Sequence, residues 1–199
     1  VIIAAADERI AHASREFGAN VIEVFDDLPS GTDRIAKAVK MLYPNQTKPN
    51  VVVNIQGDEP LIDPQTIDVV VQALSDDNSV EVATCATIIK SEVEYNDPAA
   101  VKVVVDKNGK ALYFSRSMLP HGWVTGDKCA YRHVGLYAFT WNALSEFVRL
   151  ESGELERLER LEQLRLLYHG IDIKTVLVGE NSPGIDTEAD FIIVESMIE

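Results

Sequence analysis

The chain has 199 residues, of which 46% are hydrophobic, and it carries a formal net charge of −14. This length and hydrophobic content are enough for one domain with a full core. The negative charge argues against nucleic acid as a partner, because a phosphate backbone requires clustered Lys and Arg. No apolar run is long enough to span a bilayer. Cys85 and Cys129 form no CxxC pair and fit a reduced, cytoplasmic setting.

Short apolar segments alternate with amphipathic ones in the first half of the chain. Asp7 is a predicted helix N-cap, Ser30-Gly31-Thr32-Asp33 resembles a capping box, and Asp63-Pro64 combines a cap with a proline at the first helical position. Apolar segments rich in β-branched residues precede or follow these signals, at 1–6, 21–25, 51–55 and 80–89. The alternation of strands and helices predicts a largely parallel sheet covered on both faces.

The pattern changes in the second half of the chain. Two apolar segments flank Asn108-Gly109, the strongest short signal for a β-hairpin. The other predicted elements are strands at 131–140 and 171–178 and helices at 154–169 and 188–198. Glu and Arg alternate along the helix predicted at 154–169, and most of these charges are interpreted as a solvated face.

The segment Gln56-Gly57-Asp58-Glu59-Pro60 directly follows the strand predicted at 51–55. Open α/β sheets bind ligands at the carboxyl edge of their strands, and Gly57 would let the backbone approach a ligand closely. Acidic groups at such an edge can hold Mg²⁺, which takes carboxylate and phosphate oxygens while keeping several waters. The competing interpretation is a polar turn in which Asp58 caps the next segment.

Asp186 shares its context with Asp58, since each follows a strand and a Gly-containing turn. If both strand ends reach one edge of the sheet, the two carboxylates could hold one or two Mg²⁺ ions beside a phosphoryl group. A plain helix N-cap, assisted by Thr187 with Asp190, explains Asp186 at least as well.

Two further candidate sites carry less specific signals. Backbone N–H groups at the start of the helix at Ser30 could bind an anion, with Arg34 adding a positive charge, but a simple capping turn competes. His133 and Tyr137 lie on one face of a predicted strand and could hydrogen-bond a polyol, although a lone histidine is more often structural.

Several segments together resemble the 3-deoxy-manno-octulosonate cytidylyltransferase family, also called CMP-Kdo synthetases. They run in the order of that family, and their combination is far more specific than any single piece. The segments are SGTDR (30–34), VVVNIQGDEPLI (51–62), AVKVVVD (100–106), ALYFSR (111–116), RHVGLYAF (132–139), LERLEQLRLL (158–167) and GIDT (184–187).

The resemblance implies a mixed, mostly parallel, Rossmann-like α/β sheet of the sugar-nucleotidyltransferase type with an added antiparallel hairpin. It implies a single domain over residues 1–199 that works as a homodimer. The implied reaction transfers CMP from CTP to the anomeric hydroxyl of 3-deoxy-manno-octulosonate (Kdo), releases pyrophosphate and requires Mg²⁺. The product serves lipopolysaccharide biosynthesis.

The resemblance also implies roles for individual residues. Asp58 and Asp186 match the catalytic, metal-binding aspartates of the family. The nucleotide side is matched by Ser30, Gly31, Arg34 and Asp58. The residues expected to contact or support the sugar are Gln56, His133, Tyr137, Glu156 and Gln163.

Three departures from the family pattern accompany these matches. The opening P-A-R-x-x-S-x-R-L-P-G-K segment, which binds the triphosphate, has no counterpart, so we expect this chain alone to bind CTP poorly and to turn over little. Ala5-Ala6 replaces Thr-Asp, and Ala99 replaces Asn.

Two alternatives to the implied function stay open. One is a cytidylyltransferase for a related acid sugar, such as 8-amino Kdo or sialic acid, and the other is a non-catalytic degenerate homologue.

Overall fold

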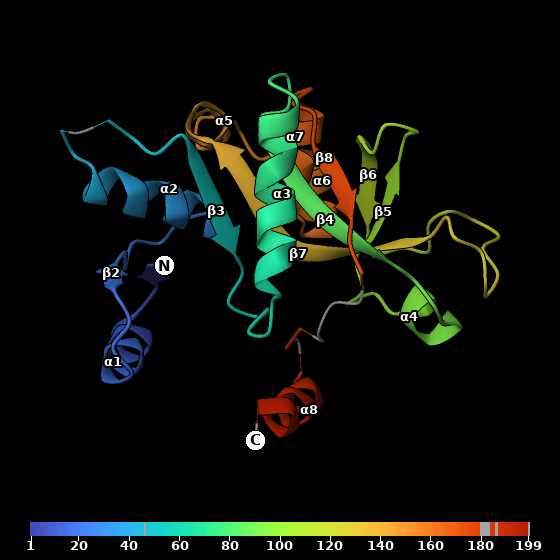
Figure 1. Cartoon of the computed structure of the whole chain (residues 1–199), viewed down its shortest axis with the longest axis horizontal. Helices are drawn as coiled ribbons and strands as arrows, with labels where there is room; N and C mark the ends of the chain where they lie inside the picture. The colour runs from blue at the N-terminus through green and yellow to red at the C-terminus, as the bar shows by residue number, and fades with distance from the viewer. Residues whose placement is uncertain (46, 180–183, 186, 199) are drawn as a thin grey trace.

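The computed structural model describes residues 1–45, 47–179, 184–185 and 187–198 (Figure 1). Its strands are β1 Ile3–Ala5, β2 Val21–Glu23, β3 Val51–Ile55, β4 Val82–Ile88, β5 Lys102–Val105, β6 Ala111–Ser115, β7 Tyr131–Thr140 and β8 Lys174–Leu177. Its helices are α1 Glu8–Glu16, α2 Gly31–Leu42, α3 Pro64–Asp76, α4 Glu92–Asn96, α5 Trp141–Phe147, α6 Glu154–Glu159, α7 Leu164–Tyr168 and α8 Glu188–Ile198.

The long strand β7 organises the main sheet. Among the described residues this sheet has six strands in the order β6-β5-β7-β4-β8, with β3 also paired to β7. β7 is antiparallel to β3, β4 and β5, whereas β4 and β8 are parallel to each other, as are β1 and β2 in a separate two-stranded sheet. The predicted mixed α/β fold is confirmed, with β7 inserted between two strands that the sequence pattern places in succession.

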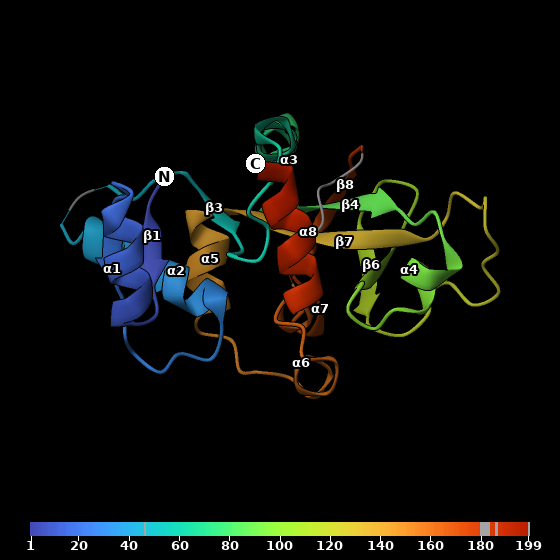
Figure 2. The same ribbon diagram turned by 90° about the horizontal axis from the view of Figure 1, so that it is seen from below.

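Helices cover both faces of this sheet, each over its own apolar core (Figure 2). On one face, Val70 and Leu74 of α3 pack on β4 and β7. On the other, side chains of α2, α5 and α7 surround Tyr137 and Phe139. Burial of both faces fits the absence of charged residues from β4 and from positions 134–139 of β7. No helix in the described ranges combines the length and apolar character needed to cross a bilayer.

The prediction of a single long helix at 154–169 is wrong. The chain forms α6 and α7 instead, and Arg160 between them adopts a left-handed backbone conformation with φ of 55°. A non-glycine residue in this region terminates a right-handed helix and is sterically unfavourable. The break lets α7 fold back, so that Arg165 reaches Glu156 and packs over the Phe147 ring. Tertiary contacts therefore override a sequence that favours helix throughout.

Candidate functional site

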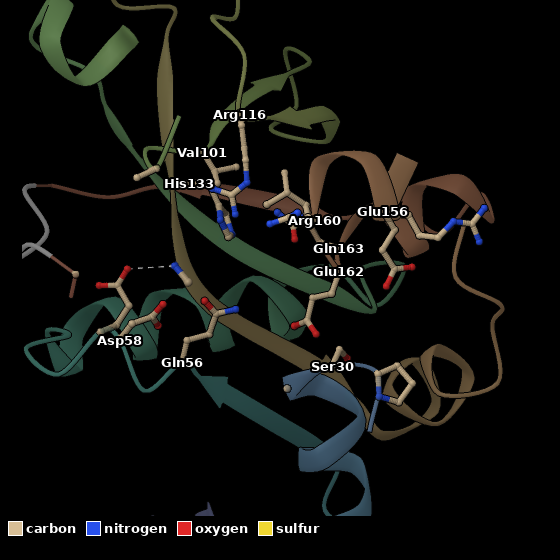
Figure 3. Close-up of a pocket in the computed structure, with 18 of the residues that line it drawn as sticks. Ser30, Gln56, Asp58, Val101, Arg116, His133, Glu156, Arg160, Glu162 and Gln163 are labelled. Atoms are coloured by element: carbon tan, nitrogen blue, oxygen red, sulfur yellow. Dashed lines mark hydrogen bonds between the residues drawn. The ribbon is translucent and has the colours of Figure 1, made fainter. Parts of the chain in front are cut away.

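A cavity of about 520 Å³ opens where β3 and β5 separate along one edge of β7 (Figure 3). β3 pairs with the second half of β7 and β5 with its beginning. The last contacts on the two sides are Gln56 N–H to the Gly135 carbonyl, at 3.2 Å, and His133 N–H to the Val101 carbonyl, at 2.8 Å. Between them, the edge of β7 faces the cavity instead of another strand. Ligands of α/β folds commonly bind where strands diverge in this way.

Gln56 enters the cavity because Gly135 leaves it room. A Cβ atom built on Gly135 would lie 2.5 Å from Gln56 Oε1 and 3.0 Å from its Cδ. Any larger residue at position 135 would therefore displace the Gln56 side chain. The Gly135 amide also donates to Glu59 Oε1 at 3.4 Å, which connects β7 to the turn that follows β3.

Asp58 lies in that turn with its carboxylate at the cavity wall (Figure 3). Its backbone carbonyl accepts a hydrogen bond of 2.8 Å from Ile185 N–H, and Gly184 also lines the cavity. The segment 184–185 is thus held beside Asp58, although the two are far apart in the sequence. Asp186 itself lies outside the described residues.

The start of α2 forms another wall of the cavity. Ser30 is the N-cap and accepts from the Asp33 amide at 3.2 Å, as the capping box predicts. Next to it, buried Thr32 donates its hydroxyl to Glu162 at 2.6 Å and accepts from the Asn54 side-chain amide at 3.1 Å. These bonds join β3, α2 and the α6–α7 connection.

Glu156 and Arg165 form a buried ion pair behind the same wall. The guanidinium donates to the Glu156 carboxylate at 2.6, 3.0 and 3.2 Å and lies 3.3 Å from Asp33 Oδ2. Burial alone would lower the pKa of Arg165, but hydrogen bonding to Glu156 and the charge of Asp33 outweigh it, and the net shift is upward. The network connects α6, α7 and the first turn of α2, and so keeps the cavity wall in place.

His133 lines the cavity from β7, above the core. Its Nε2 lies 2.9 Å from the hydroxyl of Thr84, and its ring packs at 5.2 Å from both Phe114 and Tyr137. Burial, with a smaller contribution from Arg132, lowers the pKa of His133 to about 3. The imidazole is therefore neutral at physiological pH.

Most of the predicted site residues come together in this cavity, and two lie elsewhere. Tyr137 is 1% exposed in the core below His133, where burial raises the pKa of its hydroxyl. Arg34 lines a neighbouring cavity and donates to the carbonyls of Val24 and Asp26, which fixes the loop after β2. The predicted residues that line the main cavity are Ser30, Gly31, Gln56, Asp58, His133, Glu156 and Gln163.

Sequence reasoning did not single out the arginines of the cavity wall. Arg116 and Arg132 follow or begin strands, and Arg157 and Arg160 belong to the charged stretch that was interpreted as a solvated face. Arg116 is oriented by the Glu159 and Pro98 carbonyls, at 2.9 and 3.0 Å. These cations suit phosphate and carboxylate groups, which arginine binds through two parallel N–H donors. The signal available in the sequence for Arg116, Arg132 and Arg160 was their presence within the quoted family segments, whereas Arg157 lies just outside them.

The described residues fit Mg²⁺ as a partly hydrated ion. Across the described ranges no three or more His, Cys, Asp or Glu side chains are grouped as a metal cage. Asp58 offers one carboxylate to the cavity. Mg²⁺ commonly binds through one or two carboxylates together with substrate phosphates and waters, and the carboxylate of Asp58 is compatible with that mode.

Comparison with known proteins shows that this fold and cavity belong to a nucleotidyltransferase. The profile of the family described as cytidylyltransferase matches residues 1–173. A solved structure of CMP:2-keto-3-deoxy-manno-octonic acid synthetase complexed with CTP superimposes with a TM-score of 0.85 at 36% identity. That alignment covers 96% of this chain and 77% of the other.

Curated relatives match the entire chain. A 3-deoxy-manno-octulosonate cytidylyltransferase of Desulfatibacillum aliphaticivorans is 42% identical over 202 residues, covering 100% of this chain and 81% of the relative. An 8-amino-3,8-dideoxy-manno-octulosonate cytidylyltransferase of Shewanella pealeana is 40% identical over 199 residues, covering 100% and 80%. The chain therefore belongs to the 3-deoxy-manno-octulosonate cytidylyltransferase family, as its motifs predicted.

Proposed function

We propose that the protein transfers CMP from CTP to the anomeric hydroxyl of Kdo and releases pyrophosphate, with Mg²⁺ as cofactor, for lipopolysaccharide biosynthesis. The observation that carries the proposal is the meeting of Asp58 with arginines of separate elements around one cavity. The volume of about 520 Å³ lies within the range typical of small-molecule sites. Relatives at 42% and 40% identity bear the names of cytidylyltransferases for Kdo and its 8-amino analogue.

In this proposal the side chains act by binding, orientation and charge compensation. The anomeric oxygen of the sugar forms a bond to the α-phosphorus while the bond from phosphorus to pyrophosphate breaks. Arg116, Arg132 and Arg160 would compensate the negative charge of the phosphates and of the sugar carboxylate. Asp58, with Asp186 as the matched second aspartate, would hold Mg²⁺, which supplies charge stabilisation and makes the hydroxyl easier to deprotonate.

The first test is calorimetric titration of CTP with and without Mg²⁺. We expect Mg²⁺ to increase the affinity for CTP, and Asp58→Asn to remove most of that increase. Asp68→Asn, which changes an exposed carboxylate on α3 away from the cavity, is the matched control. Equal Mg²⁺ dependence in the wild type and Asp58→Asn would refute the role of Asp58.

The second test identifies the acceptor. Pyrophosphate release is measured with CTP, Mg²⁺ and a panel containing Kdo, 8-amino Kdo and sialic acid. The proposal expects the highest kcat/KM with Kdo. A higher kcat/KM with the 8-amino sugar would indicate that the chain has the activity for which its Shewanella relative is named. Because low turnover is expected of this chain alone, the decisive comparison is with a reaction lacking sugar, and turnover no higher with any sugar of the panel than without one would favour a non-catalytic homologue.

The homodimer and the cytoplasmic location remain predictions. Light scattering coupled to size-exclusion chromatography measures the first directly, and a mass of about twice 22.0 kDa is expected. Fractionation of the source cells, with the protein recovered in the cytoplasmic fraction, measures the second.

A further inference from the structure

The hydroxyl of Thr84 connects β4 to the cavity through His133. Thr84 is fully buried, and its Oγ1 lies 2.7 Å from the carbonyl oxygen of Leu136 and 2.9 Å from His133 Nε2. Thr84 belongs to the sheet and does not line the cavity. Among the described residues, His133 connects the Thr84 hydroxyl to the lining of the cavity.

These two contacts determine which nitrogen of His133 carries the proton. A hydroxyl has one hydrogen to donate, and a carbonyl oxygen can only accept. The Thr84 hydrogen is therefore directed at Leu136, which leaves the hydroxyl oxygen as an acceptor toward the ring. His133 Nε2 must then carry a hydrogen and donate it. A neutral imidazole has a single N–H, so Nδ1 has a lone pair and no hydrogen.

The second ring nitrogen, Nδ1, is accessible. Within the described part of the chain Nδ1 has no hydrogen-bond partner. It does not belong to the buried side-chain atoms without a partner, so it is not fully buried. His133 lines the main cavity (Figure 3), so its accessible Nδ1 is available to a molecule bound there. It offers that molecule a hydrogen-bond acceptor.

We propose that Thr84 is a positioning residue that holds His133 in the Nε2–H tautomer. In this tautomer Nδ1 is a selective acceptor for a hydroxyl group of the sugar substrate. A hydroxyl or ammonium group can donate to Nδ1, whereas a phosphate, carboxylate or keto oxygen cannot. This part of the cavity would therefore select the polyol side of the acceptor over its anionic groups. The identity of the ligand rests on the proposed function, but the tautomer of His133 can be tested without any ligand.

The low basicity of the ring supports this arrangement. Burial lowers the pKa of His133 to about 3, and Arg132 contributes in the same direction. Protonation at Nδ1 would turn the acceptor into a donor, and that form is not populated near neutral pH.

Thr175 supplies an unusually close control. It is the register partner of Thr84 on the neighbouring strand β8, it is 3% exposed, and its Oγ1 has no hydrogen-bond partner in the described part of the chain. Replacing either threonine with valine removes one hydroxyl from the same sheet at nearly constant shape. Only the change at position 84 removes the acceptor of His133 Nε2.

The tautomer is tested by ¹⁵N NMR of protein labelled at histidine, with the signals of residue 133 assigned through His133→Asn. We expect the Nε2–H signature in the wild type, in Thr84→Ser and in Thr175→Val. Thr84→Val should show a mixture of tautomers. An Nδ1–H signature in the wild type would overturn the proposal, and this measurement needs no variant of Thr84 that folds.

The consequence for recognition is tested by titrating Kdo in the presence of CTP and Mg²⁺. Binding should shift the Nδ1 resonance, and Thr84→Val should weaken Kdo binding by the factor by which the measured fraction of the Nε2–H tautomer falls, with CTP affinity unchanged. Thr84→Ser should restore it. Equal loss of Kdo and CTP affinity, or no loss of either, would overturn the positioning role. Absence of Kdo binding in the wild type, with the Nε2–H signature intact, would instead contradict the proposed function.

Discussion

The ion pair between Arg165 and Glu156 leads to the sharpest stability prediction. Arg165 is 2% exposed and Glu156 9% exposed, and their hydrogen bonds are supplemented by Asp33 and by the Phe147 ring 4.2 Å from the guanidinium carbon. Arg165→Met keeps much of the side-chain volume but leaves two buried carboxylates without their cation. Breaking a buried pair from one side costs about 3–5 kcal/mol. We expect about 3 kcal/mol, since Asp33 retains its hydrogen bond from Ser30.

The assay is urea unfolding followed by circular dichroism, with the slope of free energy against urea fitted for each variant. Arg15→Met is the matched control, because Arg15 and Glu23 form an ion pair of 2.6 Å whose side chains are 51% and 45% exposed. Exposed pairs contribute about 0–1 kcal/mol. Equal destabilisation by the two substitutions would refute the reasoning.

A double variant tests the cause of the loss. The double variant combines Arg165→Met with Glu156→Leu. It removes the Glu156 carboxylate, which accepts three of the hydrogen bonds of Arg165. The unpaired charge, rather than the lost contact, dominates the cost of the single change. We therefore expect the double variant to be at least about 1 kcal/mol more stable than Arg165→Met alone. A strictly additive loss would contradict that explanation.

Three other predictions concern the cavity. The pKa of His133 is about 3 in the folded protein, compared with 6.5 for a histidine in the unfolded chain. Between these two pH values the unfolded chain therefore binds one more proton than the folded protein. Stability is thus full above pH 6.5 and falls below it, by about 2 kcal/mol between pH 7 and 5 relative to His133→Asn in urea unfolding. Arg160→Gly should leave the unfolding free energy within about 1 kcal/mol, because glycine tolerates φ of 55°, but should weaken binding of CTP or Kdo in calorimetry. Gly135→Ala should displace Gln56 and weaken Kdo binding about tenfold, with no additional loss when Gln56→Ala is combined with it.

Much of the candidate site could be predicted: local chemistry indicated Asp58, the helix start at Ser30 and His133 with competing interpretations open, and the family segments assigned their roles. The QGDEP and SGTDR segments identified Asp58, Gln56 and Ser30, all of which line the cavity. The charges of the stretch 154–169 were interpreted as solvated, since alternating Glu and Arg on one helix form exposed pairs. In the structure this stretch is broken at Arg160, and its charges divide between the buried ion pair and the cavity wall.

Features that depend on neighbours within a few residues follow from the amino-acid sequence without knowledge of the fold. Ser30 caps α2, Asn108-Gly109 forms the turn between β5 and β6, and β7 runs over the predicted residues 131–140. Caps, turns and strand periodicity are local because their hydrogen bonds and side-chain directions repeat over two to four residues.

Contacts between segments far apart in the sequence could be established only from the folded chain. The insertion of β7 between β3 and β4, the separation of β3 from β5 that opens the cavity, and the contact of Thr84 with His133 join residues tens of positions apart. Such contacts follow from burying both faces of one sheet at once, a condition on the whole chain that no local pattern contains.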